Sequence, residues 1–301
     1  MYIEQLQDKK TSLLTYLPIP LCFFAFMIFN YISTKDIDTD AVIKNIIETV
    51  GVNTAFVLLV GPLSVMCIGL LFWVKYVHQQ SLRSLTTSRK KVDWNRIFFS
   101  FFLWAAFLIG TILIAYYYNP ENYIYNFKPV PFFIFLFLAI ILIPLQTSFE
   151  EYFFRGYLMQ GIGLATKSRW FPFVFSSLAF GLMHIGNPEV GKMGYIILIY
   201  YVGTGFFLGI LTLMDEGLEL ALGFHAANNL VGALLLTSDW SAFQTHSVLK
   251  DVAAPSAGFD VLLPVFIIFP ILLFIFSKKY KWNDWQQKLF GKLKDPQPLI
   301  P

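Results

Sequence analysis

The sequence predicts an all-α polytopic membrane protein with about eight transmembrane helices. Of its 301 residues, 56% are hydrophobic and only 14% are charged, whereas a soluble domain carries about 25% charged residues. Several apolar runs are long enough to cross the ~30 Å hydrocarbon core of a bilayer. The chain shows no internal repeat and no nucleic-acid-binding motif, so we expect the lipid bilayer to be its partner and no nucleic acid.

Three spans are expected in the first part of the chain. They are the apolar runs Leu13 to Ile32, Val52 to Tyr76 and Ile97 to Tyr118. The first run has no small-residue cleavage site after it, so we interpret it as a retained anchor and not as a signal peptide. A polar, acidic segment from Asp36 to Glu48 and a basic linker over residues 83–96 separate the three runs.

Five more spans are expected after residue 130. They are Pro131 to about Gln160, Trp170 to Ile185, Gly194 to Met214, Gly217 to Thr237 and Val261 to Phe276. A polar loop from Ser238 to Gly258 precedes the last span, and a basic tail that contains tryptophan follows it.

The distribution of basic residues predicts the orientation. Eight spans place both termini on one side, and most lysines and arginines fall in segments on that side, including the linker 83–96 and the tail. Because cytoplasmic loops are enriched in Lys and Arg, we expect both termini in the cytoplasm and the protein in a bacterial cytoplasmic membrane. Cys22 and Cys67 lie in apolar runs, and we expect them to be buried thiols without a disulfide.

The fourth span carries the stretch around which we expect the protein to be organised. It is Ser148 to Arg155, at the end of a strongly apolar run. Charged groups in a bilayer cost a few kcal/mol each and mark functional sites. Glu151 and Arg155 are spaced i,i+4 on a helix and can neutralise each other. Glu150 points about 100° away, so we expect its carboxylate to be available for chemistry, or else protonated and holding helices together.

Two further spans carry histidines. The fifth ends in His184, and the seventh contains His225 and Asn229, which share one helix face at i,i+4. Glu150 and His184 are equally distant from the turn near Lys167, so straight helices would place them at the same depth. His225 is expected somewhat nearer the cytoplasmic side.

Such a set of side chains suits hydrolysis. A buried carboxylate beside an imidazole can deprotonate water, and a second His and an Asn amide can donate hydrogen bonds to an oxyanion. Alternatively, Glu150, His184 and His225 are ligand types that hold zinc with one position open for water. The histidines could instead bridge helices, and Asn228 is a weaker rival of Asn229. A proton relay in a transporter would use the same groups.

Three short motifs on these spans resemble the ordered motifs of the CPBP intramembrane proteases. That family includes prenyl-CAAX endopeptidases and bacterial proteins linked to bacteriocin self-immunity. The motifs are Glu150-Glu151-x-x-x-Arg155, Phe180-x-x-x-His184 and His225-x-x-x-Asn229. The similar region covers roughly residues 130–240, which we expect to form a catalytic helical core, flanked by the N-terminal helices in 1–129 and by the last loop, helix and tail in 241–301.

The resemblance also implies roles and a substrate. Glu150 and His184 would activate water, His225 and Asn229 would stabilise the oxyanion, and Glu151 and Arg155 would shape the site. The substrate would be a membrane-anchored or lipidated peptide or protein, prenylated or not. Both a metalloprotease and a metal-free glutamate mechanism are argued for the family, and a non-enzymatic peptide-binding immunity protein remains an alternative. Of the other histidines, we expect His78 to be solvated at the membrane interface and His246 to lie on the surface.

Overall fold

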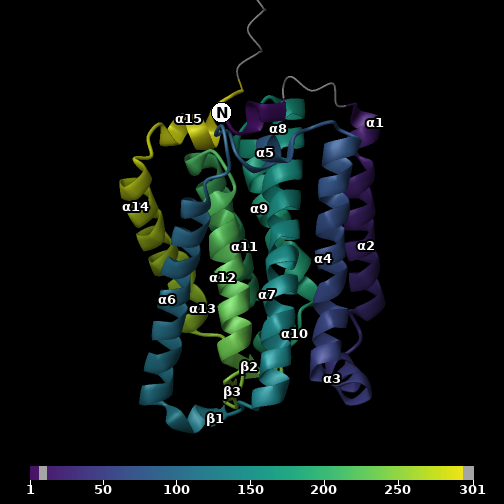
Figure 1. Ribbon diagram of the computed structural model, residues 1–301, viewed down its shortest axis with the longest axis vertical. Helices are drawn as coiled ribbons and strands as arrows, with labels where there is room; N and C mark the ends of the chain where they lie inside the picture. The colour runs from purple at the N-terminus through teal and green to yellow at the C-terminus, as the bar shows by residue number, and fades with distance from the viewer. Residues whose placement is uncertain (7–11, 294–301) are drawn as a thin grey trace, which may run out of the picture.

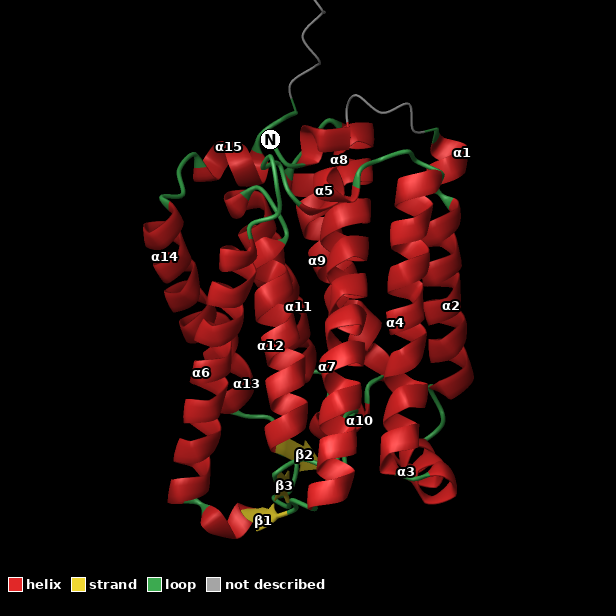
Figure 2. Cartoon of the chain, in the orientation of Figure 1, coloured by secondary structure: helices red, strands yellow, loops and turns green. Residues whose placement is uncertain are grey.

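Helices running side by side make up almost all of the protein (Figures 1 and 2). The computed structural model describes residues 1–6 and 12–293. Residues 7–11 and 294–301, which include part of the predicted basic tail, lie outside the described residues. The N-terminal segment and α15 (Trp285–Phe290) meet at one end of the bundle (Figure 1). The predicted all-α membrane fold is confirmed.

The first part of the chain forms two long helices, α4 and α6, and several shorter ones. Its elements are a 3₁₀ turn (Ile3–Leu6), α1 (Leu13–Tyr16), α2 (Pro18–Thr34), α3 (Thr39–Val50), α4 (Val52–Tyr76), α5 (Leu82–Thr86) and α6 (Trp94–Tyr118). α4 has the bounds that were predicted for the second span. α3 begins within the segment Asp36 to Glu48, which was expected only to be polar, and extends past it to Val50. It forms because the Asp38 side chain accepts a hydrogen bond from the Asp40 amide and caps its first turn. Gly51, with φ +80°, ends it and turns the chain into α4.

The second part continues with helices and three short strands. It contains a 3₁₀ turn (Pro120–Asn122), β1 (Tyr123–Tyr125), α7 (Pro129–Glu151), a π-helix (Tyr152–Leu158), α8 (Met159–Thr166), α9 (Trp170–Leu182), a 3₁₀ turn (Met183–Gly186), α10 (Pro188–Met193), α11 (Ile197–Asp215), α12 (Glu219–Leu235), β2 (Leu236–Ser238), β3 (Leu249–Asp251), α13 (Phe259–Leu263), a π-helix (Pro264–Ile268) and α14 (Phe269–Tyr280). The strands pair in the order β1-β3-β2 at the end of the bundle away from the N-terminus (Figure 2). β3 lies in the predicted polar loop Ser238 to Gly258, whereas β2 includes the last two residues of the predicted seventh span.

The predicted count of eight spans is not confirmed. In the described part of the chain, five helices are long and apolar enough to cross a membrane, namely Val52–Tyr76, Trp94–Tyr118, Pro129–Thr166, Ile197–Asp215 and Val261–Tyr280. Two shorter apolar helices are Pro18–Thr34 and Trp170–Gly186. α12 has only 17 residues and carries the polar seventh-span motif. The difference arises because α2 begins late, at Pro18, and α12 is short and polar.

α12 lies at the centre of the bundle. It packs along α6 and α7 and also contacts α11, while α4 lies along α7 and α9 along α11. The contact with α6 is unusually close, because a Cβ added to Gly223 would lie 2.1 Å from the Ile97 carbonyl oxygen. Small residues allow this approach between membrane helices. The central helix thereby holds His225 within a closely packed set of neighbours.

Two residues outside the site differ from expectation. His78 is buried and not solvated, because Gln79 adopts φ +51° and turns the chain back over the bundle. Its Nε2 lies 3.0 Å from the Tyr157 hydroxyl and accepts from the Trp73 indole at 3.1 Å. Cys67 is buried as expected, but Cys22 is exposed on α2, so the prediction of a buried thiol there is wrong. His246 is partly exposed, in line with a position near the surface.

We expect Gly223→Ala to destabilise the protein because the new methyl group would press on the α6 backbone. Overpacking of this kind costs about 1–3 kcal/mol. Thermal unfolding in detergent measures the effect, with Gly232→Ala on the same helix as the control, since a Cβ there meets no atom within 4 Å. Equal melting temperatures for the two variants would contradict the close α6–α12 contact.

Candidate active site

The Glu-Glu stretch lies where α7 changes into a π-helix. Glu150 and Glu151 end α7, and the π-helix follows over Tyr152–Leu158. Such wider turns are rare in helices and occur frequently at functional sites. Both carboxylates are inside the protein, with 3% of Glu150 and 0% of Glu151 exposed. Buried carboxylates of this kind require polar partners.

Arg155 and Glu151 form the predicted i,i+4 ion pair. Arg155 Nη1 lies 3.1 Å from Glu151 Oε1, and neither side chain is exposed. Arg155 Nη2 also donates to the Gly205 carbonyl oxygen on α11 at 3.0 Å, and the guanidinium lies over the Phe180 ring at 4.2 Å. The guanidinium is therefore held by three different helical segments.

His225 stands between the two carboxylates. Its Nδ1 donates to Glu151 Oε1 at 2.8 Å, and its Nε2 lies 3.6 Å from Glu150 Oε2. Each ring nitrogen thus faces a carboxylate oxygen. This arrangement fixes the orientation of the imidazole through Glu151 and directs its second nitrogen toward Glu150. The structure therefore brings together the residues of two of the three motifs.

A chain of amides supports the other oxygen of Glu150. Gln146 Nε2 donates to Glu150 Oε1, and Asn229 Nδ2 donates to Gln146 Oε1 at 3.1 Å. Asn228 donates to Asn229 Oδ1 at 3.1 Å and accepts from the Trp104 indole at 3.1 Å. Glu150 Oε2, in contrast, has no hydrogen-bond partner in the described structure. One carboxylate oxygen is thus held in place and the other is left free.

The same chain of amides changes the interpretation of Asn229. The resemblance implied direct oxyanion stabilisation, but one amide hydrogen of Asn229 is engaged by Gln146. Asn229 therefore contacts the carboxylate of Glu150 through Gln146. The sequence analysis did not assign Gln146 a role, although its i,i+4 spacing from Glu150 is a signal that could have found it.

His184 lies at the rim of this cluster. It belongs to the 3₁₀ turn after α9, and its Nδ1 donates to the Phe180 carbonyl oxygen at 2.8 Å. Its ring stacks on Tyr201 with centroids 4.3 Å apart and an interplanar angle of 14°. In this neutral tautomer Nε2 is an acceptor. The Phe180 ring lies between the two histidines, with centroid distances of 5.1 Å to His184 and 5.8 Å to His225.

The described residues do not fit a three-ligand metal site as they are arranged. They contain no group of three or more His, Cys, Asp or Glu side chains that could hold a metal ion. His225 directs both ring nitrogens at carboxylates, and His184 uses Nδ1 for a backbone carbonyl. Zinc sites in enzymes use three protein ligands that converge on the ion. The mechanism below therefore uses no step through a metal.

Comparison with known proteins shows a similarity over these residues. Residues 129–231 match the family model described as type II CAAX prenyl endopeptidase Rce1-like. We call residues 129–231 the Rce1-like segment after this similarity. It contains all three motifs, so the resemblance to the CPBP proteases is confirmed. The Rce1-like segment begins with α7 and ends within α12.

One relative extends beyond the Rce1-like segment. The chain is 33% identical over 171 residues to the uncharacterized protein YyaK of Bacillus subtilis (strain 168), over 56% of this chain and 57% of that protein. The match thus spans a little over half of the relative's length. No solved structure matches the chain.

We expect Arg155→Met to destabilise the protein strongly because it leaves the Glu151 carboxylate buried without its cation. Breaking a buried ion pair in this way costs about 3–5 kcal/mol. Arg83→Met is the control, since the Arg83 side chain is exposed and its hydrogen bond to the Arg89 carbonyl is on the surface. Thermal unfolding in detergent measures both, and an Arg155→Met protein as stable as the control would show that the pair is not needed.

Proposed function

We propose that the protein is an intramembrane endopeptidase that hydrolyses a peptide bond in a membrane-associated protein or peptide, with prenylated CAAX-type substrates among the candidates. The observation that carries this proposal is the free Oε2 of Glu150, buried and 3.6 Å from His225 Nε2. A carboxylate oxygen in this position suits a general base that takes a proton from water. The Rce1-like match supports peptide bonds as the target.

In the proposed reaction, Glu150 and the free Nε2 of His184 orient one water molecule. The water oxygen attacks the scissile carbonyl carbon while its proton passes to Glu150. The resulting oxyanion is stabilised by a proton on His225 Nε2, which Glu151 favours by accepting from Nδ1. Glu150 then returns the proton to the leaving amine as the C–N bond breaks. Arg155 contributes by fixing Glu151 and does not contact the substrate.

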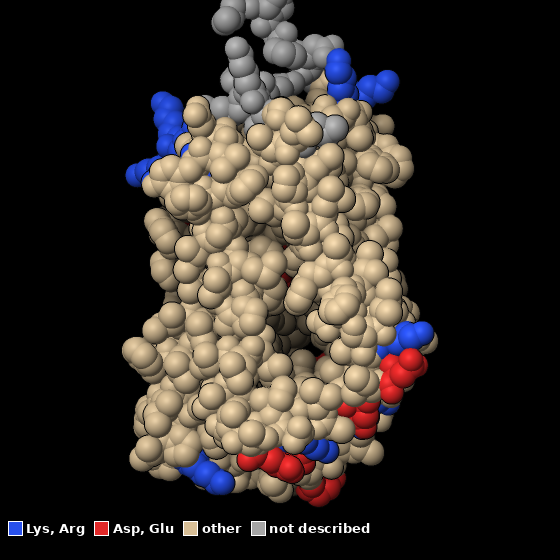
Figure 3. Space-filling model, turned by 90° about the vertical axis from the view of Figure 1, so that its right-hand side faces the viewer, with Lys and Arg blue, Asp and Glu red and all other residues tan. Residues whose placement is uncertain are grey.

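The distribution of charged residues supports the proposed membrane location and orientation of the protein. Figure 3 shows lysines and arginines at the end near the chain termini, while the opposite end carries both acidic and basic residues. This pattern supports a bacterial cytoplasmic membrane with both termini cytoplasmic.

We expect Glu150→Gln to reduce cleavage by about 10²- to 10⁴-fold because the amide cannot accept the proton from water. Purified protein in detergent would be incubated with membrane-tethered peptides, prenylated and unprenylated, and products followed by mass spectrometry. Glu121→Gln, an exposed carboxylate in a turn, is the control. Cleavage by Glu150→Gln at the normal rate would overturn the proposal, and parallel reactions with a chelator test for a required metal.

We expect Gln146→Leu to lower kcat about 10- to 100-fold with little change in KM. A hydrogen bond to a charged group contributes about 1.5–3 kcal/mol, and its loss would let Glu150 turn away from the water. Thr147→Val is the control, since the neighbouring hydroxyl contacts only backbone carbonyls of its own helix. An unchanged kcat for Gln146→Leu would rule out this positioning role. Partial recovery in Gln146→Asn, which keeps an amide donor, would not be expected from loss of stability alone.

A proton-coupled transporter is the second candidate, and the continuous polar chain favours it. Hydrogen bonds connect Trp104 through three amides to Glu150, and His225 links Glu150 to Glu151. Its titratable part, which runs from Glu151 through His225 to Glu150, is of the type that carries protons in pumps and transporters. Proton uptake by protein in liposomes, lost in Glu150→Gln, would support this candidate over the protease.

A further inference from the structure

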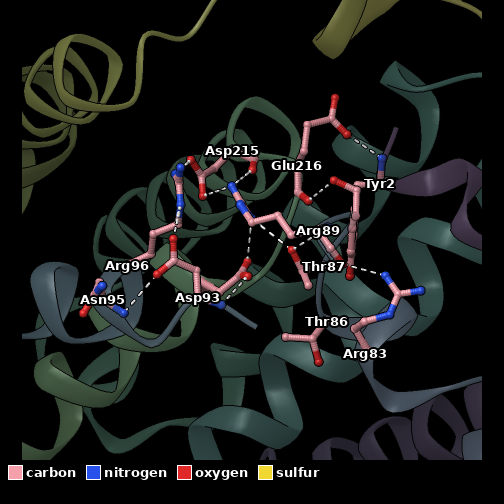
Figure 4. A network of polar contacts seen from close by, with 12 residues as sticks. Tyr2, Arg83, Thr86, Thr87, Arg89, Asp93, Asn95, Arg96, Asp215 and Glu216 are labelled. Atoms are coloured by element: carbon pink, nitrogen blue, oxygen red, sulfur yellow. Dashed lines mark hydrogen bonds and ion pairs between the residues drawn. The ribbon is translucent and has the colours of Figure 1, made fainter. Parts of the chain in front are cut away.

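The end of the bundle that holds the terminal segments is closed by a network of ion pairs. Arg89 contacts Asp215 at 2.9 Å and Glu219 at 3.0 Å, and Arg96 also pairs with Asp215 (Figure 4). Both acidic side chains are almost fully buried. The network connects the basic linker to the turn between α11 and α12. It thereby holds the end of α11 and the start of α12 in place.

Tyr2 is buried at the same end of the bundle. It is fully buried and packs in one cluster with Leu218, Leu222 and Tyr152. Tyr152 directly follows Glu151, and Leu222 precedes His225 by less than one turn of α12. Packed side chains therefore separate the catalytic cluster from the end with the termini.

A groove lies beside the segment that follows His184. It has a volume of about 420 Å³ and lies between the end of α2 with the following turn and the segment from Ile185 to Tyr195. Its walls include Thr34, Lys35, Gly186, Asn187 and Gly191. We call it the α2–α10 groove. Figure 3 looks onto the side of the molecule on which α2 lies, and this face is hollowed between its two ends.

The α2–α10 groove adjoins the candidate active site. Ile185 and Gly186, which line it, directly follow His184. Asn187 donates to the Tyr201 hydroxyl at 3.4 Å, and Tyr201 stacks on His184. His184 is half-buried, whereas at most 5% of His225 and of the two carboxylates is exposed. The most exposed side chain of the four is therefore the one that directly precedes the groove lining in the chain.

The lining indicates the chemistry of the occupant. Threonine, asparagine and glycine backbone groups can form hydrogen bonds with an extended polypeptide. Asn187 itself is extended, with φ −69° and ψ 146°. Lys192 lies 3.3 Å from Asp40 and 4.0 Å from Asp38, so the charges near the groove largely compensate one another. These features suit a polar, uncharged peptide segment better than an isoprenoid chain.

We propose that the α2–α10 groove binds the polar polypeptide segment next to the scissile bond and is the route by which the substrate reaches Glu150. This inference rests on the proposed protease function. It places substrate access at the side of α2 and α10, away from the end that holds the terminal segments. The substrate class that follows is a membrane-tethered chain with an extended polar segment at its cleavage site.

We expect Gly186→Trp and Gly191→Trp to lower cleavage of a tethered peptide at least tenfold while leaving the melting temperature unchanged. A Cβ at either position meets no atom within 4 Å, and both glycines line the groove, so we expect an indole there to obstruct it. Gly110→Trp on α6 and Gly232→Trp on α12 are matched controls, since they have equally open surroundings outside the groove. Normal cleavage by both groove variants would overturn the proposal.

A labelling experiment tests the groove without relying on turnover. Gly191→Cys would be introduced into a Cys22→Ser, Glu150→Gln protein and labelled with a water-soluble maleimide. We expect the tethered peptide to slow this labelling several-fold and to leave that of Glu121→Cys unchanged. Equal labelling with and without the peptide would overturn the groove proposal. If the peptide slows the labelling of Gly191→Cys but the Glu150→Gln protein still cleaves it at the normal rate, the groove proposal stands and only the proposed role of Glu150 is overturned.

Discussion

The buried guanidinium of Arg155 is the constraint on which the site depends. No part of its side chain is exposed, so the protein must supply the interactions that water would provide. Glu151, the Gly205 carbonyl and the Phe180 ring supply them from α7, α11 and α9. Glu151 then accepts from His225 on α12. One cation therefore fixes the mutual positions of four helices around the polar cluster.

Two neighbouring carboxylates acquire different tasks from these contacts. Glu151 is held by a cation and an imidazole and has little freedom to move. Gln146 holds one oxygen of Glu150. The second oxygen of each carboxylate has no hydrogen-bond partner in the described structure, but only that of Glu150 lies near the free side of the His225 ring, 3.6 Å from Nε2. Adjacent acids in distinct environments are a recurrent way to separate structural and chemical roles in one site. The local geometry, and not the residue type, makes Glu150 the candidate base.

The sequence predicted the features that depend on local helical spacing. The Glu151–Arg155 pair and the limits of α4 follow from the i,i+4 rule and from hydropathy, and both are present. The contact of His225 with both carboxylates was not predicted, since straight helices placed His225 nearer the cytoplasmic side than Glu150. The span count was less accurate because apolar runs do not fix where helices begin and end, and Pro18–Thr34, Trp170–Gly186 and α12 are all shorter than a full span. Contacts between distant segments, such as Tyr201 on His184, have no local signature.

Backbone irregularities were beyond prediction for a related reason. The π-helix after Glu151 and the positive φ of Gln79 are imposed by packing against other helices. The turn at Gln79 buries His78, which local polarity placed in solvent. The groove beside His184 likewise arises where α2 meets the turn Met183–Gly186 and α3 meets α10. These segments are more than 140 residues apart, as the hydrogen bond from Thr39 to the Gly186 carbonyl oxygen shows. Such features belong to the tertiary structure.

The central claim is that a water molecule held by Glu150 attacks the peptide bond directly. A single-turnover cleavage in H₂¹⁸O, with excess enzyme and mass analysis of the new carboxyl terminus, tests it most directly. The account predicts that the first product molecules carry one ¹⁸O atom, because the solvent oxygen enters in the only chemical step. First-turnover products with ¹⁶O alone would show that an oxygen of the protein is transferred through a covalent intermediate, and would contradict the account.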